Sequence, residues 1–126
     1  MVRDCAGKIG SLDLVATSGK LRARQTAEIF CAAAGYPAVR IEEADAMRLD
    51  WASALPGDGW KMVSNLPYNV AVPLVVDMLE EVPQIRSYLV MVQREIGERL
   101  AAAPGDEAYG AVSVRVRYRA DAQVAR

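Results

Sequence analysis

Short apolar runs alternate with amphipathic stretches along the C-terminal two thirds of the chain. The apolar runs predict strands over residues 38–44, 60–64 and 88–92. The last run, from Tyr88 to Val92, is apolar at every position, which is typical of a strand that is buried on both faces. These three segments are the expected strands of a sheet.

The stretches between and after these strands have the spacing of helices. Residues 73–81 place apolar side chains on one helical face, at Leu74, Val75, Met78 and Leu79. Pro73 suits a first helical turn, and Pro83 marks the end of the helix. A second helix is expected over residues 93–103, where a Pro-Gly pair stops it.

Strands that alternate with helices indicate an α/β domain with a mostly parallel sheet. Such a sheet binds ligands at the carboxyl ends of its strands, so polar residues that directly follow a predicted strand are the first site candidates. Residues 109–118 are ambiguous, because their valines alternate with polar residues in the period of a strand. The resemblance described below favours a helix there, and a helix is our prediction.

Composition and charge set limits on the partners of the chain. It has 126 residues, the size of one domain, and 52% of them are hydrophobic, enough to build a buried core. Its formal net charge is −1, so an RNA partner would need a local basic patch. The C-terminal end offers one candidate patch, formed by Arg115, Arg117, Arg119 and Arg126. Solvated faces of a strand or helix are the ordinary alternative.

The cysteine and histidine content excludes several kinds of site. The chain has two cysteines, Cys5 and Cys31, and no histidine. Two cysteines without a secretory segment are typical of a reducing cytosol, a zinc site is disfavoured, and a histidine-dependent catalytic triad is excluded. No apolar run reaches the length of a membrane span. We expect a cytoplasmic monomer with no metal and no membrane partner.

The segment Asn65-Leu66-Pro67-Tyr68 has the most specific chemistry. It follows a predicted strand and resembles the Asn/Asp-X-Pro-Tyr/Phe motif of amino-group methyltransferases. The N6 amine of adenine is a poor nucleophile, because its lone pair is delocalised into the ring. Two acceptors, the Asn65 side chain and the Pro67 carbonyl, would free that lone pair, and the Tyr68 ring could stack on the base. A strand-to-helix turn without a catalytic role is the ordinary alternative for the tetrapeptide alone.

A longer series around this motif resembles the ribosomal RNA adenine N6-dimethyltransferases that act on the small subunit. The series consists of Asn-Leu-Pro-Tyr-Asn-Val-Ala at 65–71, Met-Val-Gln-Arg-Glu at 91–95, Glu-Arg-Leu at 98–100 and Tyr-Gly-Ala-Val-Ser-Val at 109–114. The resemblance covers about residues 38–120. Val72 departs from it, because the family usually has a threonine there that would cap a helix starting at Pro73. Valine cannot accept the capping hydrogen bond, so we expect a loss of about 1 kcal/mol of helix stability.

The resemblance implies a partial Rossmann-like class I methyltransferase domain over residues 1–126, truncated at both ends and lacking the family's C-terminal helical domain. It implies methyl transfer from S-adenosylmethionine to N6 of adenines in small-subunit ribosomal RNA, with Asn65, Pro67 and Tyr68 as catalytic residues. The partner would be that RNA or the immature small ribosomal subunit. Two alternatives stay open: a non-catalytic RNA-binding module of ribosome assembly, and an inactive fragment of the enzyme.

The resemblance also implies a set of cofactor residues. Asp45 follows the predicted strand at 38–44 and is expected to accept a hydrogen bond from the adenine amine of S-adenosylmethionine. The backbone N–H of Ala46 or Met47 would face the adenine ring, and Asn65 would contribute to the same site. An aspartate that caps a turn is the ordinary alternative for Asp45.

The glycine-rich cofactor loop of the family is altered in this chain. Gly7 and Gly10 are its expected remnants, since glycines let the backbone approach the cofactor closely. Residues 27–29 resemble the end of the family's second strand, so Glu28 is the expected ribose ligand. The interval from Glu28 to Asp45 is then short by roughly two helical turns.

Overall fold

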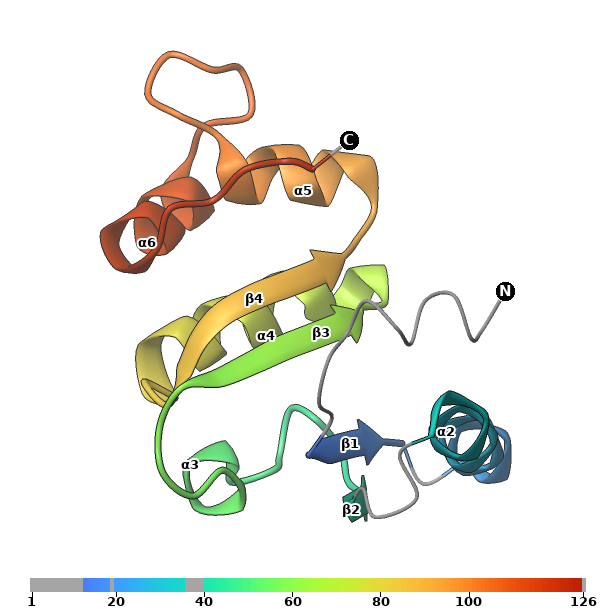
Figure 1. Ribbon diagram of the computed structural model, residues 1–126. Coiled ribbons are helices and arrows are strands. Elements are labelled where there is room, and N and C mark those ends of the chain that lie inside the picture. The colour runs from blue at the N-terminus through green and yellow to red at the C-terminus, as the bar shows by residue number, and fades with distance from the viewer. Residues whose placement is uncertain (1–12, 19, 36–39, 126) are drawn as a thin grey trace. The chain divides into compact units, whose positions relative to one another are not determined.

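The computed structural model describes residues 13–18, 20–35 and 40–125. The chain divides into two compact units, Met1–Leu49 and Asp50–Arg126. In both units, parallel strands are joined by a helix (Figure 1). The α/β class with parallel strands, predicted from the sequence, is therefore confirmed.

The first unit is a β–α–β segment. Strand β1 (Leu14–Thr17) leads into helix α2 (Leu21–Ala34), which returns the chain to strand β2 (Arg40–Glu43). The two strands pair in parallel, and α2 contacts both of them. Strand β2 confirms the strand predicted over residues 38–44. A parallel pair needs a crossover of this kind, because its two strands start at the same end of the sheet.

Helix α2 includes residues 27–29, where the resemblance suggested the end of a strand, and that prediction is wrong. The buried residues of the helix are Ala27 and Cys31, which lie one turn apart on its inner face. Gly35 ends the helix with a positive φ of 82°, the left-handed conformation in which many helices terminate. Buried positions four residues apart are helical in period, so residues 27–29 pack as part of a helix.

The second unit has β3 and β4 as its strands, and α4 is the crossover helix between them. The elements in chain order are α3 (Trp51–Ala54), β3 (Trp60–Asn65), α4 (Tyr68–Glu81), β4 (Ile85–Met91), α5 (Arg94–Ala101) and α6 (Ala111–Arg119). Strands β3 and β4 pair in parallel. The strand predicted at 60–64 and the helices predicted at 93–103 and 109–118 are confirmed as β3, α5 and α6. Strand β4 confirms the last predicted strand but begins three residues before it.

Helix α4 begins at Tyr68, five residues before the predicted start at Pro73, which lies inside the helix. Ala71 explains the difference, because it is completely buried and extends the apolar face of Leu74, Val75 and Met78 back by one turn. The predicted missing cap at Val72 therefore does not apply, since Val72 is an interior residue of the helix.

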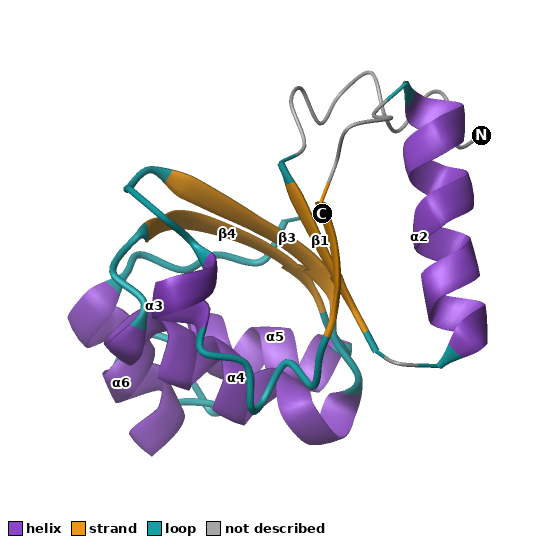
Figure 2. Cartoon of the chain, turned by 90° about the horizontal axis from the view of Figure 1, so that it is seen from below, coloured by secondary structure: helices purple, strands orange, loops and turns teal. Residues whose placement is uncertain are grey.

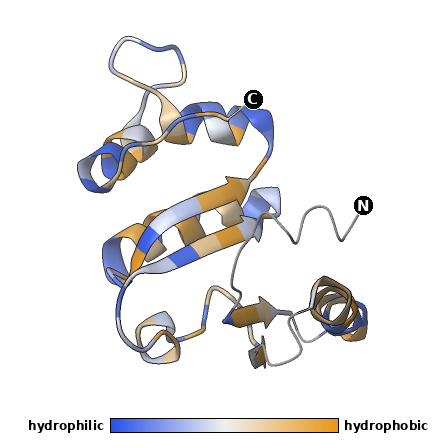
Figure 3. Cartoon of the chain, viewed as in Figure 1, coloured by the Kyte–Doolittle hydropathy of each residue, from blue (hydrophilic) through white to orange (hydrophobic). Residues whose placement is uncertain are grey.

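Strand β4 is not buried on both faces in the described structure, contrary to the prediction from its apolar run. Leu89 and Met91 are 62% and 63% exposed, whereas Tyr88 and Val90, which alternate with them along the strand, are partly buried. Helices α4, α5 and α6 all lie on one face of β3 and β4 (Figure 2). The hydropathy colouring shows that the C-terminal half of β4 consists of apolar residues (Figure 3). The alternation of burial follows from this one-sided cover.

Candidate functional site

The Asn-Leu-Pro-Tyr segment lies where a strand passes into a helix. Asn65 is the last residue of β3 and Tyr68 is the first residue of α4. In the parallel register, Asn65 lies opposite Met91 at the end of β4, and the Leu66 N–H donates a 2.9 Å hydrogen bond to the Met91 carbonyl. The segment is thus held at the carboxyl ends of two adjacent parallel strands, where sheets of this class bind ligands.

Burial separates one anchoring residue of this segment from the three exposed ones. The Leu66 side chain is 7% exposed and packs into the core. Asn65 and Pro67 are exposed, and the Tyr68 ring is 67% exposed. The buried leucine and the strand register hold the backbone in place. Asn65 and Tyr68 are thereby left exposed on this fixed backbone.

The carbonyl groups of the segment differ in what they contact. The Pro67 carbonyl accepts hydrogen bonds from the N–H groups of Val70, at 3.1 Å, and Ala71, at 3.0 Å, which open α4. A carbonyl oxygen has two lone pairs, so both are engaged in the helix. The Leu66 carbonyl, one residue earlier, accepts no hydrogen bond from the residues that the structure describes. The sequence motif alone does not show which of the two carbonyls is engaged, because that depends on where the helix begins.

Asp45 lies just beyond β2 and forms a turn. Its Oδ1 accepts a 2.9 Å hydrogen bond from the Met47 N–H, and its backbone carbonyl accepts from the N–H groups of Arg48 and Leu49. The turn interpretation of Asp45 is therefore correct as local structure. The Met47 N–H points at Asp45 and is not available to an adenine ring. The Asp45 side chain is 60% exposed, with Oδ2 at 3.7 Å from the Arg48 Nε, so the carboxylate can still accept from a ligand.

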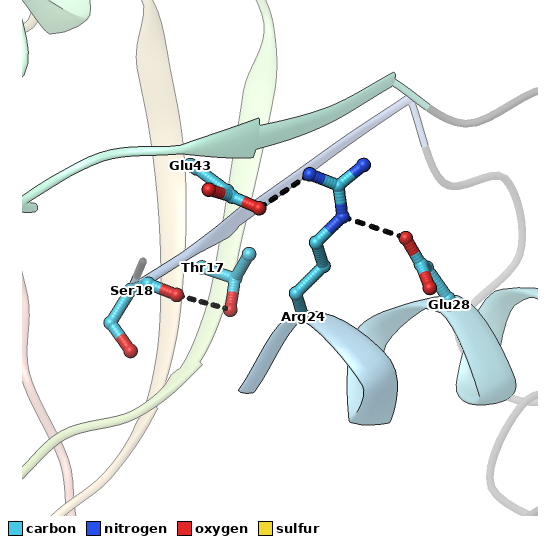
Figure 4. A network of polar contacts seen from close by, with 5 residues as sticks. All are labelled: Thr17, Ser18, Arg24, Glu28 and Glu43. Carbon is cyan, nitrogen blue, oxygen red and sulfur yellow. Dashed lines mark hydrogen bonds and ion pairs between the residues drawn. The ribbon is translucent and has the colours of Figure 1, made fainter. Parts of the chain in front are cut away.

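Glu28 lies in the middle of α2, one helical turn after Arg24. The Arg24 guanidinium donates to Glu28 at 2.8 Å and to Glu43 of β2 at 2.6 Å, as Figure 4 shows. These two hydrogen bonds raise the pKa of Arg24. Glu28 is thus engaged in an ion pair on a helix and does not stand at a strand end, so the structural argument for a ribose contact is lost.

The strand that precedes β2 in the described structure ends at Thr17. Thr17 lies opposite Glu43 in the parallel register, and the Ala44 N–H extends the pairing with a 3.0 Å hydrogen bond to the Thr17 carbonyl. A complete β–α–β segment therefore fits between Leu14 and Glu43. The short interval before Asp45 arose from placing the strand end at Glu28.

The glycine predictions, Gly7 and Gly10, lie outside the described residues. Within the described ranges, no group of three or more His, Cys, Asp and Glu side chains could hold a metal ion. Across the same ranges, no helix is long and apolar enough to cross a membrane.

A family model described as ribosomal RNA adenine dimethylase matches residues 19–125. The chain belongs to this family. The matched region contains Asp45 and the Asn-Leu-Pro-Tyr segment, but it begins after Gly7 and Gly10. The parallel α/β architecture of the chain is that of a partial Rossmann-like methyltransferase domain.

Curated relatives of the family carry the name ribosomal RNA small subunit methyltransferase A. The chain is 49% identical over 75 residues to that of Rhodococcus opacus, covering 60% of this chain and 25% of the relative. It is 49% identical over 84 residues to that of Thermobifida fusca, covering 66% of this chain and 28% of the relative. To that of Rubrobacter xylanophilus it is 44% identical over 87 residues, covering 69% of this chain and 33% of the relative. The matches thus span about a quarter to a third of these relatives.

Proposed function

We propose that these 126 residues are part of one methyltransferase domain that transfers methyl groups from S-adenosylmethionine to N6 of adenines in small-subunit ribosomal RNA. The observation that carries the proposal is the pair formed by the exposed Asn65 amide and the Leu66 carbonyl, which accepts no hydrogen bond from the described part of the chain. Both acceptors belong to one loop at the carboxyl ends of β3 and β4.

Two acceptors of this kind favour the reactive form of an adenine amine. The Asn65 side-chain oxygen and the Leu66 carbonyl each accept one N–H of the amine, so its lone pair turns away from the ring toward the methyl donor. We assign the second acceptor to Leu66 in place of Pro67, because the Pro67 carbonyl is engaged in α4. Pro67 keeps the loop rigid, and the exposed Tyr68 ring stacks on the extruded base.

The described residues fit one part of S-adenosylmethionine. The exposed Asp45 carboxylate follows a parallel strand and would accept the adenine amine of the cofactor. We assign the ribose contact to the Thr17 hydroxyl, at the end of the neighbouring strand, in place of Glu28; this hydroxyl lies 3.4 Å from the Ser18 carbonyl. When bound, the cofactor supplies an electrophilic methyl group on a sulfonium. Catalysis by the protein is mainly positioning and electrostatic stabilisation, and the proton leaves the amine after transfer.

A methylation assay tests this proposal. The chain is incubated with methyl-labelled S-adenosylmethionine and small ribosomal subunits that lack the modification, and labelled N6,N6-dimethyladenosine is measured. We expect Asn65→Ala to abolish transfer, and Asn65→Asp, which keeps an acceptor oxygen, to retain part of it. Transfer by Asn65→Ala at the unaltered rate would overturn the catalytic role of Asn65.

The second candidate function is a non-catalytic RNA-binding module in ribosome assembly. The family match favours it in one respect, because the match begins at residue 19 and excludes the altered glycine stretch. Calorimetric titration with S-adenosylmethionine separates the two functions. Saturable binding supports the enzyme, whereas RNA binding by a folded chain that takes up no cofactor supports the assembly module.

A further inference from the structure

One side of helix α6 is fixed to the rest of the second unit. The Ser113 hydroxyl donates a 2.7 Å hydrogen bond to the Arg99 carbonyl of α5, and Val116 is 3% exposed. Arg115 makes a two-point ion pair with Glu80 of α4, at 2.9 and 2.7 Å. These contacts fix one side of α6 and pair the Glu80 carboxylate with the Arg115 guanidinium.

The other side of α6 is open and carries aromatic and cationic groups. Val114, Arg117 and Tyr118 lie at helical spacing on this side, with Val114 49% and the Tyr118 residue 81% exposed. Arg117 is exposed and makes no ion pair with any residue in the described ranges. The Arg119 guanidinium lies 5.3 Å from the centroid of the Tyr118 ring. We call Val114, Arg117, Tyr118 and Arg119 the α6 face.

We propose that the α6 face binds a single-stranded segment of the RNA substrate away from the adenine that is methylated, an inference that rests on the proposed function. An unpaired guanidinium attracts a phosphate, and a solvent-exposed tyrosine presents a ring on which a base can stack. The cation over the Tyr118 ring strengthens this platform toward an anionic strand. Charge and aromatic exposure together favour RNA over an acidic protein surface, which would use the arginines but not the stacking ring.

The α6 face and the proposed catalytic loop are attached to opposite ends of helix α4. Glu80, which holds Arg115, lies near the end of the helix that Tyr68 begins. Those 12 positions correspond to about 18 Å of helix at 1.5 Å per residue. The α6 face is attached near the far end of α4 from the catalytic loop, so it does not form the base pocket.

Fluorescence anisotropy with a labelled RNA hairpin that has a single-stranded adenine loop tests the proposal. We expect Arg117→Ala to weaken binding and to lower the slope of log affinity against log salt by about one. Arg86→Ala, which removes an exposed arginine of β4 whose charge is paired with Asp58, is the matched control and should leave the slope unchanged. Tyr118→Leu should weaken binding about tenfold, and Tyr118→Phe should retain it.

Equal effects of Arg117→Ala and Arg86→Ala would overturn the proposal, because they would show attraction to overall charge only. Full affinity in Tyr118→Leu would also overturn it, as would poly-glutamate binding with the same dependence on Arg117. The methylation assay keeps the two proposals separate. Active α6-face variants that bind RNA normally refute only the α6 face. Weakened RNA binding in these variants, together with a wild-type chain that transfers no methyl group, refutes only the enzymatic function.

Discussion

The Leu66 N–H and the Met91 carbonyl, 2.9 Å apart, extend the pairing of β3 and β4 by one residue past the end of β3. This hydrogen bond holds the backbone directly after Asn65, so the amide and the following carbonyl stay at a fixed spacing. The buried Leu66 side chain anchors the same residue from the other direction. The geometry of the candidate acceptors therefore depends on the core of the second unit.

Replacement of the anchoring leucine tests this dependence. We expect Leu66→Ala to lower the free energy of unfolding by about 2–5 kcal/mol, because the buried side chain leaves a cavity. Leu89→Ala is the matched control, and it should change stability by less than about 0.5 kcal/mol, since Leu89 is 62% exposed. Urea unfolding followed by circular dichroism measures both. Equal losses in the two variants would show that Leu66 is not a core residue.

The proline inside α4 should limit the stability of that helix. Pro73 cannot donate the hydrogen bond to the Asn69 carbonyl one turn earlier, so Pro73→Ala should raise the free energy of unfolding by about 1–3 kcal/mol. Pro83 lies beyond the end of α4, and Pro83→Ala should give no such gain. The comparison is made by urea unfolding. A loss of stability in Pro73→Ala would place the start of the helix nearer to the position predicted from the sequence.

Two exposed carboxylates of the first unit, those of Asp45 and Glu28, are expected to contribute differently to the affinity for S-adenosylmethionine. Asp45→Ala should weaken S-adenosylmethionine binding, because Asp45 follows a parallel strand and has an exposed carboxylate. Glu28→Ala should leave the affinity unchanged, since Glu28 lies in α2 and pairs with Arg24. Calorimetric titration of both variants checks this. Unaltered affinity in Asp45→Ala would leave Asp45 as a turn residue only.

The attachment of α6 to α4 should weaken in acid. The hydrogen bonds from Arg115 hold the pKa of Glu80 below its ordinary value of 4.5. A carboxyl group with a lowered pKa in the folded state contributes stability that is present above the ordinary value and is lost as pH falls through the lowered one. The urea midpoints of the wild type and Glu80→Gln should therefore differ above pH 4.5 and converge in stronger acid. Glu107→Gln, at an exposed loop position, is the control and should follow the wild type at every pH.

Local sequence patterns predicted the elements of the second unit well and those of the first unit poorly. The apolar runs located β3 and β4 because short apolar runs bounded by turn residues are typical of strands, and the Asn-Leu-Pro-Tyr motif located the loop between β3 and α4. The same patterns did not show that α2 includes residues 27–29, since the buried face of this helix consists only of Ala27 and Cys31. Two small side chains give too weak a periodic signal to distinguish a helix from a strand end.

The sequence by itself determined the α/β class, the family resemblance and the candidate residues Asn65 and Tyr68, because these depend on local order and residue type. Only the tertiary structure decided that the Pro67 carbonyl is engaged in α4 while the Leu66 carbonyl accepts no hydrogen bond from the described residues. It also decided that β1 ends at Thr17 and that Leu89 is exposed. The physical reason is that hydrogen-bond partners and burial are set by contacts between segments far apart in the sequence.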